Sequence, residues 1–321
     1  MLKKIFDELA GLGTEQRNPR TMNLDAMTTR EILEVMNAED RTVPEVVARA
    51  IPEIERAVEL IAKALQSGGR LFYVGAGTSG RLGVLDAAEC PPTFGSDPWQ
   101  VQGFIAGGPS ALVKPVEGAE DSFEQAAHDL EICALNEEDV LVGITASRRT
   151  PYVLGALSHA GERDAKRVFI ICNEPPNPKS QIPNSKSQAE QTVADVIISL
   201  PVGPEVLTGS TRLKAGTATK LVLNMLTTAA MVKSGKCYEN LMVDLRMGSM
   251  KLRARARKIM IELTGCDYEW ADEILNQADN ELKTALVMHW KGATAEHARE
   301  MLEEKGGSVR RVIEEGLRPE T

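Results

Sequence analysis

Five short apolar runs recur along the middle of the chain, and each is followed by a stretch with helical spacing of its apolar positions. Runs of this length, bounded by glycine, proline and polar residues, are typical of buried strands. Apolar strands that alternate with helices indicate an α/β protein with a doubly wound parallel sheet, because parallel strands need a crossover connection. The predicted strands are Leu71–Val74, Val101–Ala106, Val140–Ile144, Val168–Cys172 and Val196–Leu200.

The chain before the first predicted strand has polar and amphipathic stretches. Residues 1 to about 25 are polar, and we expect an extended segment that wraps over the body of the protein or over a neighbour. Thr28 and Glu31 have the spacing of a capping box, which predicts a short helix that ends near Asn37. Val43–Leu65 has the apolar spacing of one longer amphipathic helix.

Two later regions depart from the strand–helix order. Residues 173–191 are rich in proline, asparagine, serine, lysine and glutamine, and they predict an exposed loop. Beyond about residue 245 the pattern predicts only helices, and the first of them is basic. The chain therefore divides into three predicted regions: an N-terminal extended and helical segment (1–50), an α/β domain (51–245) and a small helical domain (246–321).

Composition limits the classes of function. The 321 residues carry a net charge of −9 with no stripe of basic and aromatic side chains, so nucleic-acid binding is not expected. No apolar run reaches the ~18 residues of a membrane span, and the N-terminus lacks the apolar core of a signal peptide. Five widely spaced cysteines and four histidines show no metal-ligand spacing, which argues for the reducing cytoplasm and against disulfides or structural zinc.

Three turns rich in hydroxyl groups stand out. The first, Gly75–Gly80, and the second, Ala146–Pro151, each follow a predicted strand, and the third, Thr208–Thr217, leads into a predicted helix. Hydroxyl groups at helix starts are usually only N-caps. Two such turns on neighbouring strands of one sheet nevertheless favour a phosphate site, because free N–H groups and helix dipoles meet at the carboxyl edge.

The first turn does not match two common nucleotide-binding motifs. It lacks the lysine of a Walker A loop. It also lacks a third glycine at the spacing of a dinucleotide fingerprint, and no acidic residue ends the next strand. Both ATP binding through a P-loop and NAD binding are therefore weak interpretations.

Carboxylates near the turns form a second group of candidate residues. Glu89 lies in Asp86–Gly95, where we expect two prolines to end the helix and to leave Glu89 in its last turn. Glu117 and Glu120 precede the next predicted helix, where an acidic residue usually only interacts with the helix dipole. A pair of glutamates beside a phosphosugar would suit proton transfer without a metal.

Seven longer motifs resemble those of the N-acetylmuramic acid 6-phosphate etherases. The resemblance runs from about residue 14 to the C-terminus, in the order that the family has. The motifs are Thr14–Pro19, Gly75–Gly83, Asp86–Gly95, Val116–Ser122, Arg149–Val153, Thr208–Ala218 and Asn240–Asp244.

The resemblance implies the SIS (sugar isomerase) fold, a five-stranded parallel sheet between helices, with a small helical domain after it. It also implies cleavage of the lactyl ether at C3 of the amino sugar, in cell-wall recycling, to N-acetylglucosamine 6-phosphate and D-lactate. In the open-chain sugar the C1 aldehyde acidifies the C2 proton, so a carboxylate can remove it and lactate can leave from C3. Water then adds at C3, and no metal or redox cofactor is required.

The resemblance also implies roles for individual residues. By the family's pattern Glu89 is the acid that serves the lactate oxygen, and Glu120 is the other acid–base residue, acting at C2. Arg148 is a departure, since the family usually has glycine there, and it adds a β-carbon and a guanidinium to the second turn. The residues expected to bind the phosphate and the sugar are Gly77, Thr78, Ser79, Ser147, Thr150, Ser210 and Thr211, with Lys214 as a charge partner.

Two other functions compete with the etherase. The first is a phosphosugar sensor without catalytic activity, as in the related regulatory protein of glucokinase, and the second is an isomerase of hexose phosphates. A sensor needs the turns but not the pair Glu89 and Glu120, and the Glu-Cys-Pro-Pro stretch has no evident purpose in an isomerase. Because a second subunit commonly completes SIS sites, we expect a homodimer with shared active sites.

Overall fold

The computed structural model describes residues 11–174, 194–245 and 247–314. The chain forms two compact units: unit 1 holds residues 1–87 and 102–226, and unit 2 holds residues 88–101 and 227–321. Two of the three boundaries fall inside helices, α5 (Gly77–Phe94) and α8 (Lys214–Lys233), and the third falls inside strand β2 (Val101–Ile105). The three predicted regions differ from these units in their bounds and stay a prediction.

Unit 1 is built on a five-stranded sheet with the order β2-β1-β3-β4-β5. Strands β1, β3, β4 and β5 pair in parallel, and Gly75 at the end of β1 lies beside Ile144 of β3. The prediction of a doubly wound sheet is confirmed, because the strand order reverses direction between β1 and β3. The strands are β1 (Leu71–Gly75), β2 (Val101–Ile105), β3 (Val140–Thr145), β4 (Lys166–Ile171) and β5 (Val196–Ser199).

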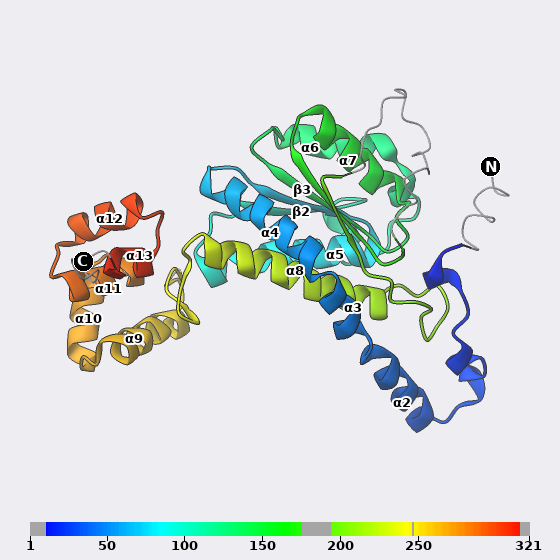
Figure 1. The fold of residues 1–321 in the computed structure, drawn as a ribbon, viewed down its shortest axis with the longest axis horizontal. Helices are drawn as coiled ribbons and strands as arrows, with labels where there is room; N and C mark the ends of the chain where they lie inside the picture. Colours follow the sequence, from blue (N-terminus) through cyan, green and yellow to red (C-terminus); the bar gives the residue numbers. More distant parts are fainter. Residues whose placement is uncertain (1–10, 175–193, 246, 315–321) are drawn as a thin grey trace, which may run out of the picture. The chain divides into compact units, whose positions relative to one another are not determined.

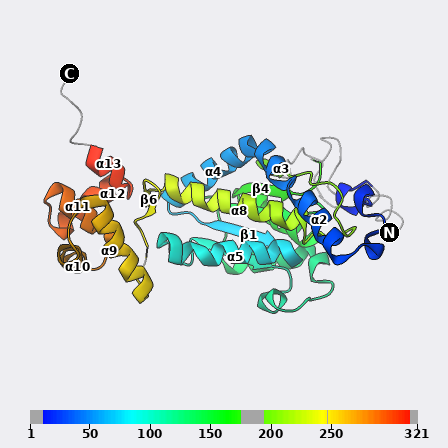
Figure 2. The same cartoon turned by 90° about the horizontal axis from the view of Figure 1, so that it is seen from below.

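Helices cover both faces of the sheet, as Figures 1 and 2 show. On one face lie α4 (Ile51–Gln66), α5 and α8, and on the other lie α6 (Phe123–Ile132) and α7 (Pro151–Glu162). Every residue of β1 and β3 is buried, which explains why these strands read as continuous apolar runs. A β-carbon on Gly143 would lie 2.9 Å from Val153 Cγ1, so this glycine lets α7 pack closely on the sheet.

The N-terminal part confirms one prediction and corrects another. The capping box of Thr28 and Glu31 is present at the start of α2 (Thr29–Asp40). The single helix expected over 43–65 is wrong, because the chain forms α3 (Val43–Arg49) and α4 with a break at Ala50. Proline in the first turn of α4 has no N–H to donate, and it therefore begins a new helix instead of continuing the previous one.

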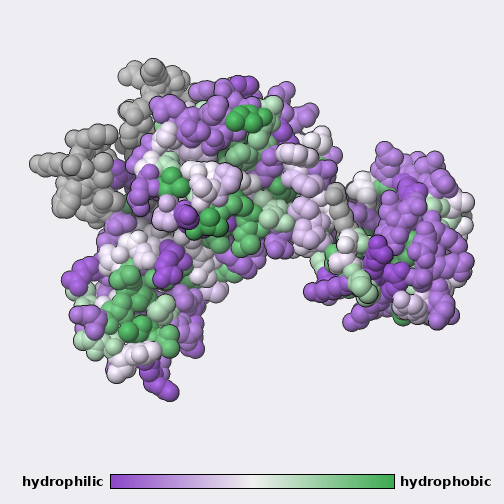
Figure 3. All heavy atoms as spheres, turned by 180° about the vertical axis from the view of Figure 1, so that it is seen from behind, coloured by the Kyte–Doolittle hydropathy of each residue, from purple (hydrophilic) through white to green (hydrophobic). Residues whose placement is uncertain are grey.

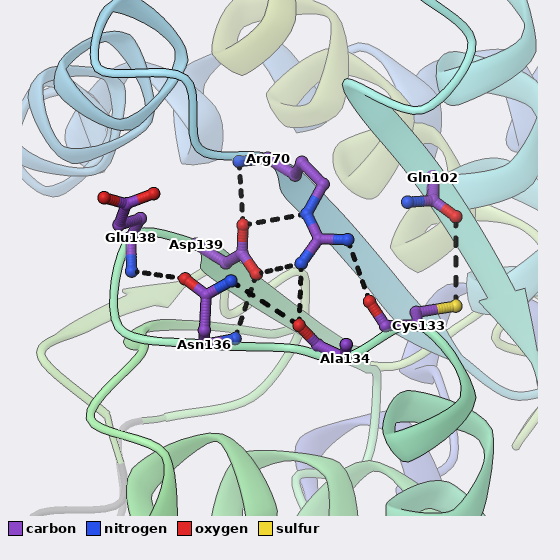
Figure 4. Close-up of polar contacts among 7 residues, drawn as sticks. All are labelled: Arg70, Gln102, Cys133, Ala134, Asn136, Glu138 and Asp139. Atoms are coloured by element: carbon purple, nitrogen blue, oxygen red, sulfur yellow. Dashed lines mark hydrogen bonds and ion pairs between the residues drawn. The ribbon is translucent and has the colours of Figure 1, made fainter.

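An ion pair between the partly exposed Arg70 and the buried Asp139 fixes the amino ends of β1 and β3 (Figure 4). Arg70 donates from Nε to Asp139 Oδ1 at 3.0 Å and from Nη2 to Oδ2 at 2.6 Å, and its other N–H groups reach the carbonyl oxygens of Cys133 and Ala134. The backbone N–H groups of Arg70 and Asn136 also donate to the Asp139 carboxylate, which is 1% exposed. The guanidinium of Arg70 and the carboxylate of Asp139 are therefore bonded both to each other and to the backbone.

Unit 2 contains a short hairpin and helices around a core of its own. The helix-only prediction for the C-terminal part is confirmed, whereas the hairpin was missed because strands of two residues show no period. None of the helices in the described ranges combines the length and apolar character that a membrane crossing requires. The elements are β6 (Cys237–Tyr238), β7 (Leu241–Met242), α9 (Met250–Thr264), α10 (Tyr268–Gln277), α11 (Leu282–Lys291), α12 (Ala295–Glu304) and α13 (Val309–Glu314).

Candidate active site

The first turn leaves three backbone donors open at the start of α5. A β-carbon on Gly75 would lie 2.6 Å from Gly80 N, so only glycine allows strand and helix to approach this closely. Within the described residues, no acceptor reaches the N–H groups of Gly77, Thr78 and Ser79. Free donors at the positive end of an 18-residue helix form an anion site.

The second turn places a cluster of hydroxyl groups on the neighbouring strand. Thr145 Oγ1 lies 2.8 Å from Thr150 Oγ1 and 3.3 Å from Ser147 Oγ, which also accepts the N–H of Arg149. Because Gly75 pairs with Ile144, the first and second turns begin about 5 Å apart, the spacing of adjacent strands. The expected convergence of these two turns is therefore present in the backbone.

The third turn lies beside the first, but its helix start is already occupied. A β-carbon on Gly216 in α8 would lie 3.4 Å from Thr78 Cγ2. The carboxylate of Glu205 accepts the N–H groups of both Lys214 and Ala215 at 3.0 Å. Burial raises the pKa of Glu205, and these two N–H groups counteract the rise. The N-terminus of α8 is thus capped from within the protein.

Lys214 is buried in an ion pair. Its Nζ lies 2.6 Å from Glu39 Oε2, and the two side chains are 4% and 5% exposed. Burial alone would raise the pKa of Glu39, but hydrogen bonds from Lys214, Asn18 and Arg20 outweigh it and lower the pKa. This placement favours a structural role for Lys214, which ties α8 to α2.

Glu120 lies on a short 3-10 helix, η5 (Ala119–Asp121), and is exposed to solvent. Gly107, just beyond β2, approaches this segment so closely that a β-carbon there would lie 3.0 Å from Val116 Cβ and 3.2 Å from Ala119 Cβ. The segment also contacts α7. Glu120 is thereby held near the carboxyl edge of the sheet, where the first two turns lie.

Glu89 is exposed on α5, but the expected end of this helix is wrong. The helix continues through Pro91 and Pro92 to Phe94, so Glu89 is not in its last turn. Each proline removes its own N–H donor and crowds the carbonyl four residues before it, and the helix continues despite both effects. Glu89 follows Thr78 by eleven residues of α5 and lies in the part of this helix that belongs to unit 2.

Arg148 adopts a left-handed backbone conformation, with φ of 61°. This region favours glycine, because a β-carbon crowds the backbone there. The guanidinium donates from Nη1 to the carbonyl of Glu174 at 3.0 Å, at the end of the described part of the loop after β4. The rest of the predicted loop, residues 175–191, lies outside the described residues.

Several residues that shape the site gave no signal in the sequence. Glu205 caps α8 from nine residues before it, Glu39 neutralises Lys214, and Asn173 contacts the second turn. Thr14, in the first of the quoted motifs, is 1% exposed and bonded to Asn173. These contacts join residues that are distant in sequence, so no local pattern predicts them.

Unit 2 contains the last of the quoted motifs. Asn240–Asp244 forms part of the β6–β7 hairpin, and Asp244 pairs with Lys236 at 2.7 Å and Lys283 at 2.9 Å. Asp244 and Lys283 line a cavity of about 510 Å³. Burial lowers the pKa of Lys283, and the charge of Asp244 opposes this. In the part of the chain that the structure describes, no group of three His, Cys, Asp or Glu residues could hold a metal ion.

Comparison with known proteins agrees with this geometry. The sheet order fits a protein of the SIS class, and the family model "Glucokinase regulatory protein N-terminal SIS domain" matches residues 53–161. The phosphoheptose isomerase GmhA of Neisseria gonorrhoeae covers 63% of this chain and 98% of its own, with 19% identity and a TM-score of 0.45, too distant to bear on function.

Much more similar relatives cover nearly the whole chain. Proteins named N-acetylmuramic acid 6-phosphate etherase share 50% identity in Mycolicibacterium smegmatis, over 96% of this chain and 100% of the relative. They share 49% in Actinobacillus pleuropneumoniae, over 97% and 98%, and 51% in Salinibacter ruber, over 97% and 96%. The chain belongs to the family of N-acetylmuramic acid 6-phosphate etherases.

Proposed function

We propose that this protein cleaves the lactyl ether of N-acetylmuramic acid 6-phosphate and releases D-lactate and N-acetylglucosamine 6-phosphate. The structural observation that carries the proposal is the open N-terminus of α5, where Gly77, Thr78 and Ser79 offer three N–H groups without an acceptor among the described residues. Such a site binds a phosphate dianion through backbone donors and the helix dipole. We assign the lactyl ether as the bond that is cleaved because relatives with about 50% identity are named N-acetylmuramic acid 6-phosphate etherase.

The phosphate serves as a handle that positions the reacting carbons. Thr78 and Ser79 would hold it, and the hydroxyl groups of the second turn, Ser147 and Thr150, would complete the phosphosugar site. Ser210 and Thr211 follow in the third turn, which lies beside Thr78. Binding energy at the phosphate then orients C2 and C3 toward the acid–base residues.

The reaction needs a base at C2 and an acid at C3. Glu120 removes the C2 proton of the open-chain aldehyde, and the C3–O bond breaks as Glu89 gives its proton to the lactate oxygen. Water then adds to C3 of the unsaturated aldehyde and C2 regains a proton, so the sum is substrate plus water giving lactate and N-acetylglucosamine 6-phosphate. Both glutamates are exposed in the single chain, as side chains that meet a ligand or a second subunit would be.

We expect a homodimer with shared active sites. Glu89 is exposed on α5. Leu85, on the same side of α5, is 54% exposed, and Leu33 on α2 is 61% exposed. Figure 3 shows apolar side chains gathered on the surface of unit 1. These surfaces suit a second copy of the chain, whose Glu89 would complete the site.

The compartment is also a proposal. The five cysteines, all within the described residues, form no disulfide, and Cys90 and Cys172 are buried. Five reduced thiols suit the reducing cytoplasm, where a phosphorylated amino sugar is also retained.

The test begins with the wild-type protein and N-acetylmuramic acid 6-phosphate in heavy-oxygen water. We expect release of D-lactate, with the heavy oxygen at C3 of the sugar product, because elimination and hydration break and remake the C3–O bond. Lactate that carries the heavy oxygen, or a folded protein that binds the phosphosugar and releases no lactate, would contradict the proposal. The second result would favour a phosphosugar sensor.

Mixed dimers test the shared site. Glu89→Ala and Glu120→Ala should each lose activity by about 10²- to 10⁴-fold, the usual share of an acid or base. If the two glutamates of a site come from different subunits, dimers reassembled from both variants regain up to about a quarter of the wild-type rate. Mixtures as inactive as their parents, despite verified subunit exchange, would show that each chain supplies both groups.

A further inference from the structure

We propose that Thr14 and Asn173 form a brace that holds the second and third turns at the spacing that the phosphosugar requires. The brace deepens the proposed function, on which it rests, because it concerns the same site. Both side chains are among the most buried polar groups of unit 1, with Thr14 1% and Asn173 4% exposed. Neither is expected to touch the substrate, and both are positioning residues.

The amide of Asn173 connects the second turn to the N-terminal segment. Its Nδ2 donates to the carbonyl of Ala146 at 2.7 Å and to Thr14 Oγ1 at 3.2 Å. Its Oδ1 accepts the N–H of Thr14 at 3.4 Å. The hydroxyl of Ser199 donates to the carbonyl of Asn173 at 2.6 Å, which also fixes the backbone of Asn173 to the end of β5.

Thr14 continues the connection to the third turn. Its carbonyl accepts the N–H of Gly209 at 3.2 Å, directly before Ser210 and Thr211. Gly209 has a φ of 77°, a conformation that suits glycine, so the turn is shaped to present this N–H. One series of hydrogen bonds therefore runs from Ala146 through Asn173 and Thr14 to Gly209.

The brace fixes the distance between the second and third turns, which strand pairing in the sheet does not fix. Pairing of β1 with β3 fixes the first turn relative to the second, since both leave adjacent strands. The third turn follows an irregular stretch between β5 and α8, and no strand sets its distance from the second turn. Ser147 and Thr150 on one side and Ser210 and Thr211 on the other therefore depend on side chains for their spacing. A ligand held by both groups is sensitive to that spacing.

The test uses a pair of matched threonines in the same segment. Thr14→Val keeps the shape of the side chain and the backbone hydrogen bonds but removes the Oγ1 acceptor. Thr21→Val is the control, because Thr21 is 9% exposed and its Oγ1 donates to the carbonyl of Val206 at 2.8 Å, with no bond to Asn173. Thr14→Ser retains the hydroxyl and should restore wild-type behaviour.

The readouts are calorimetric affinity for N-acetylglucosamine 6-phosphate and the kinetics of lactate release. For Thr14→Val we expect the Kd and KM to rise about three- to tenfold, the worth of one neutral hydrogen bond, with kcat within about twofold of wild type. Thr21→Val and Thr14→Ser should stay within about twofold of the wild-type Kd. If the hydrogen bond of Thr14 mattered only for folding, Thr14→Val and Thr21→Val would have similar Kd values.

The other possible outcomes contradict either the brace or the proposed function. Equal Kd values for Thr14→Val and Thr21→Val, or a fall in kcat with an unchanged Kd, would overturn the brace. If Thr14→Val does not fold, Asn173→Asp carries the same expectation, because it loses the donor to Ala146 and keeps its size. A wild-type protein that binds the phosphosugar without releasing lactate would overturn the proposed function alone, since the brace is judged from Kd.

Discussion

The two ends of the strand pair β1–β3 are built in opposite ways. At the amino ends Arg70 and Asp139 form an ion pair in which the carboxylate and guanidinium are bonded to each other and to the backbone. At the carboxyl ends three N–H groups, on Gly77, Thr78 and Ser79, have no acceptor among the described residues. One end of the strand pair thus contributes stability, while the donors at the other end meet no acceptor in the described part of the chain, as the proposed phosphate site requires.

Removing the ion pair at the amino ends of β1 and β3 should have the largest effect on stability. Arg70→Leu leaves the carboxylate of Asp139 buried without its guanidinium partner, and we expect a loss of about 3–5 kcal/mol in the free energy of unfolding. Urea denaturation measures this loss. Lactate release per folded molecule should be unchanged, because the pair lies at the opposite end of the strands from the turns. A loss of activity in a protein of wild-type stability would contradict this division of roles.

The ion pair of Lys214 and Glu39, beside the third turn, tests the same comparison through the pH dependence of stability. Glu39→Gln leaves the ammonium of Lys214 buried and unpaired, and we expect about 3 kcal/mol of destabilisation near pH 7. Because the pKa of Glu39 is lowered from 4.5 in the folded protein, its contribution is present above that value and is lost as the pH falls through the folded pKa.

Denaturation of wild type and Glu39→Gln from about pH 7 to about pH 3 checks the sign of this effect. The gap between their stabilities should narrow as the pH falls. A gap that widens toward acid would show that Glu39 is not ionised in the folded protein.

At the carboxyl ends of β1 and β3, a substitution should lower the affinity for the phosphosugar and leave the stability of the protein unchanged. Ser79→Ala removes one hydroxyl beside the free N–H groups of α5, and a hydrogen bond to a charged group is worth about 1.5–3 kcal/mol. We expect the Kd for N-acetylglucosamine 6-phosphate to rise by about 10- to 100-fold, measured by calorimetry, with the melting temperature of the free protein unchanged. Ser110→Ala serves as control, since Ser110 donates only to the carbonyl of Gly107 among the described residues. Equal Kd values in the two variants would remove Ser79 from the site.

The smallest effect is expected at Arg148, where the second turn carries strain. Arg148→Gly relieves the left-handed conformation at φ of 61° and should stabilise the protein by about 0.5–1 kcal/mol. It also removes the exposed hydrogen bond to Glu174, which contributes little. Thermal unfolding measures the change, and a lower melting temperature would show that the guanidinium contact outweighs the strain.

Local patterns in the sequence determined much of the fold. The five strands are confirmed because fully buried parallel strands are continuous apolar runs, and the capping box of Thr28 and Glu31 depends on residues three apart. The first two turns were identified because glycine and hydroxyl groups follow strands directly. Their convergence followed from the rule that parallel strands end at one edge.

Tertiary structure alone decided how the third turn is built. Glu205 occupies the start of α8, Glu39 neutralises Lys214, and Thr14 meets Asn173 although 159 residues separate them. The continuation of α5 through two prolines likewise overrode a local rule. The physical reason is the same for Glu205, Glu39 and Thr14: buried charges and hydrogen-bonding groups take whichever partner the folded chain brings near, and such partners have no fixed spacing in sequence.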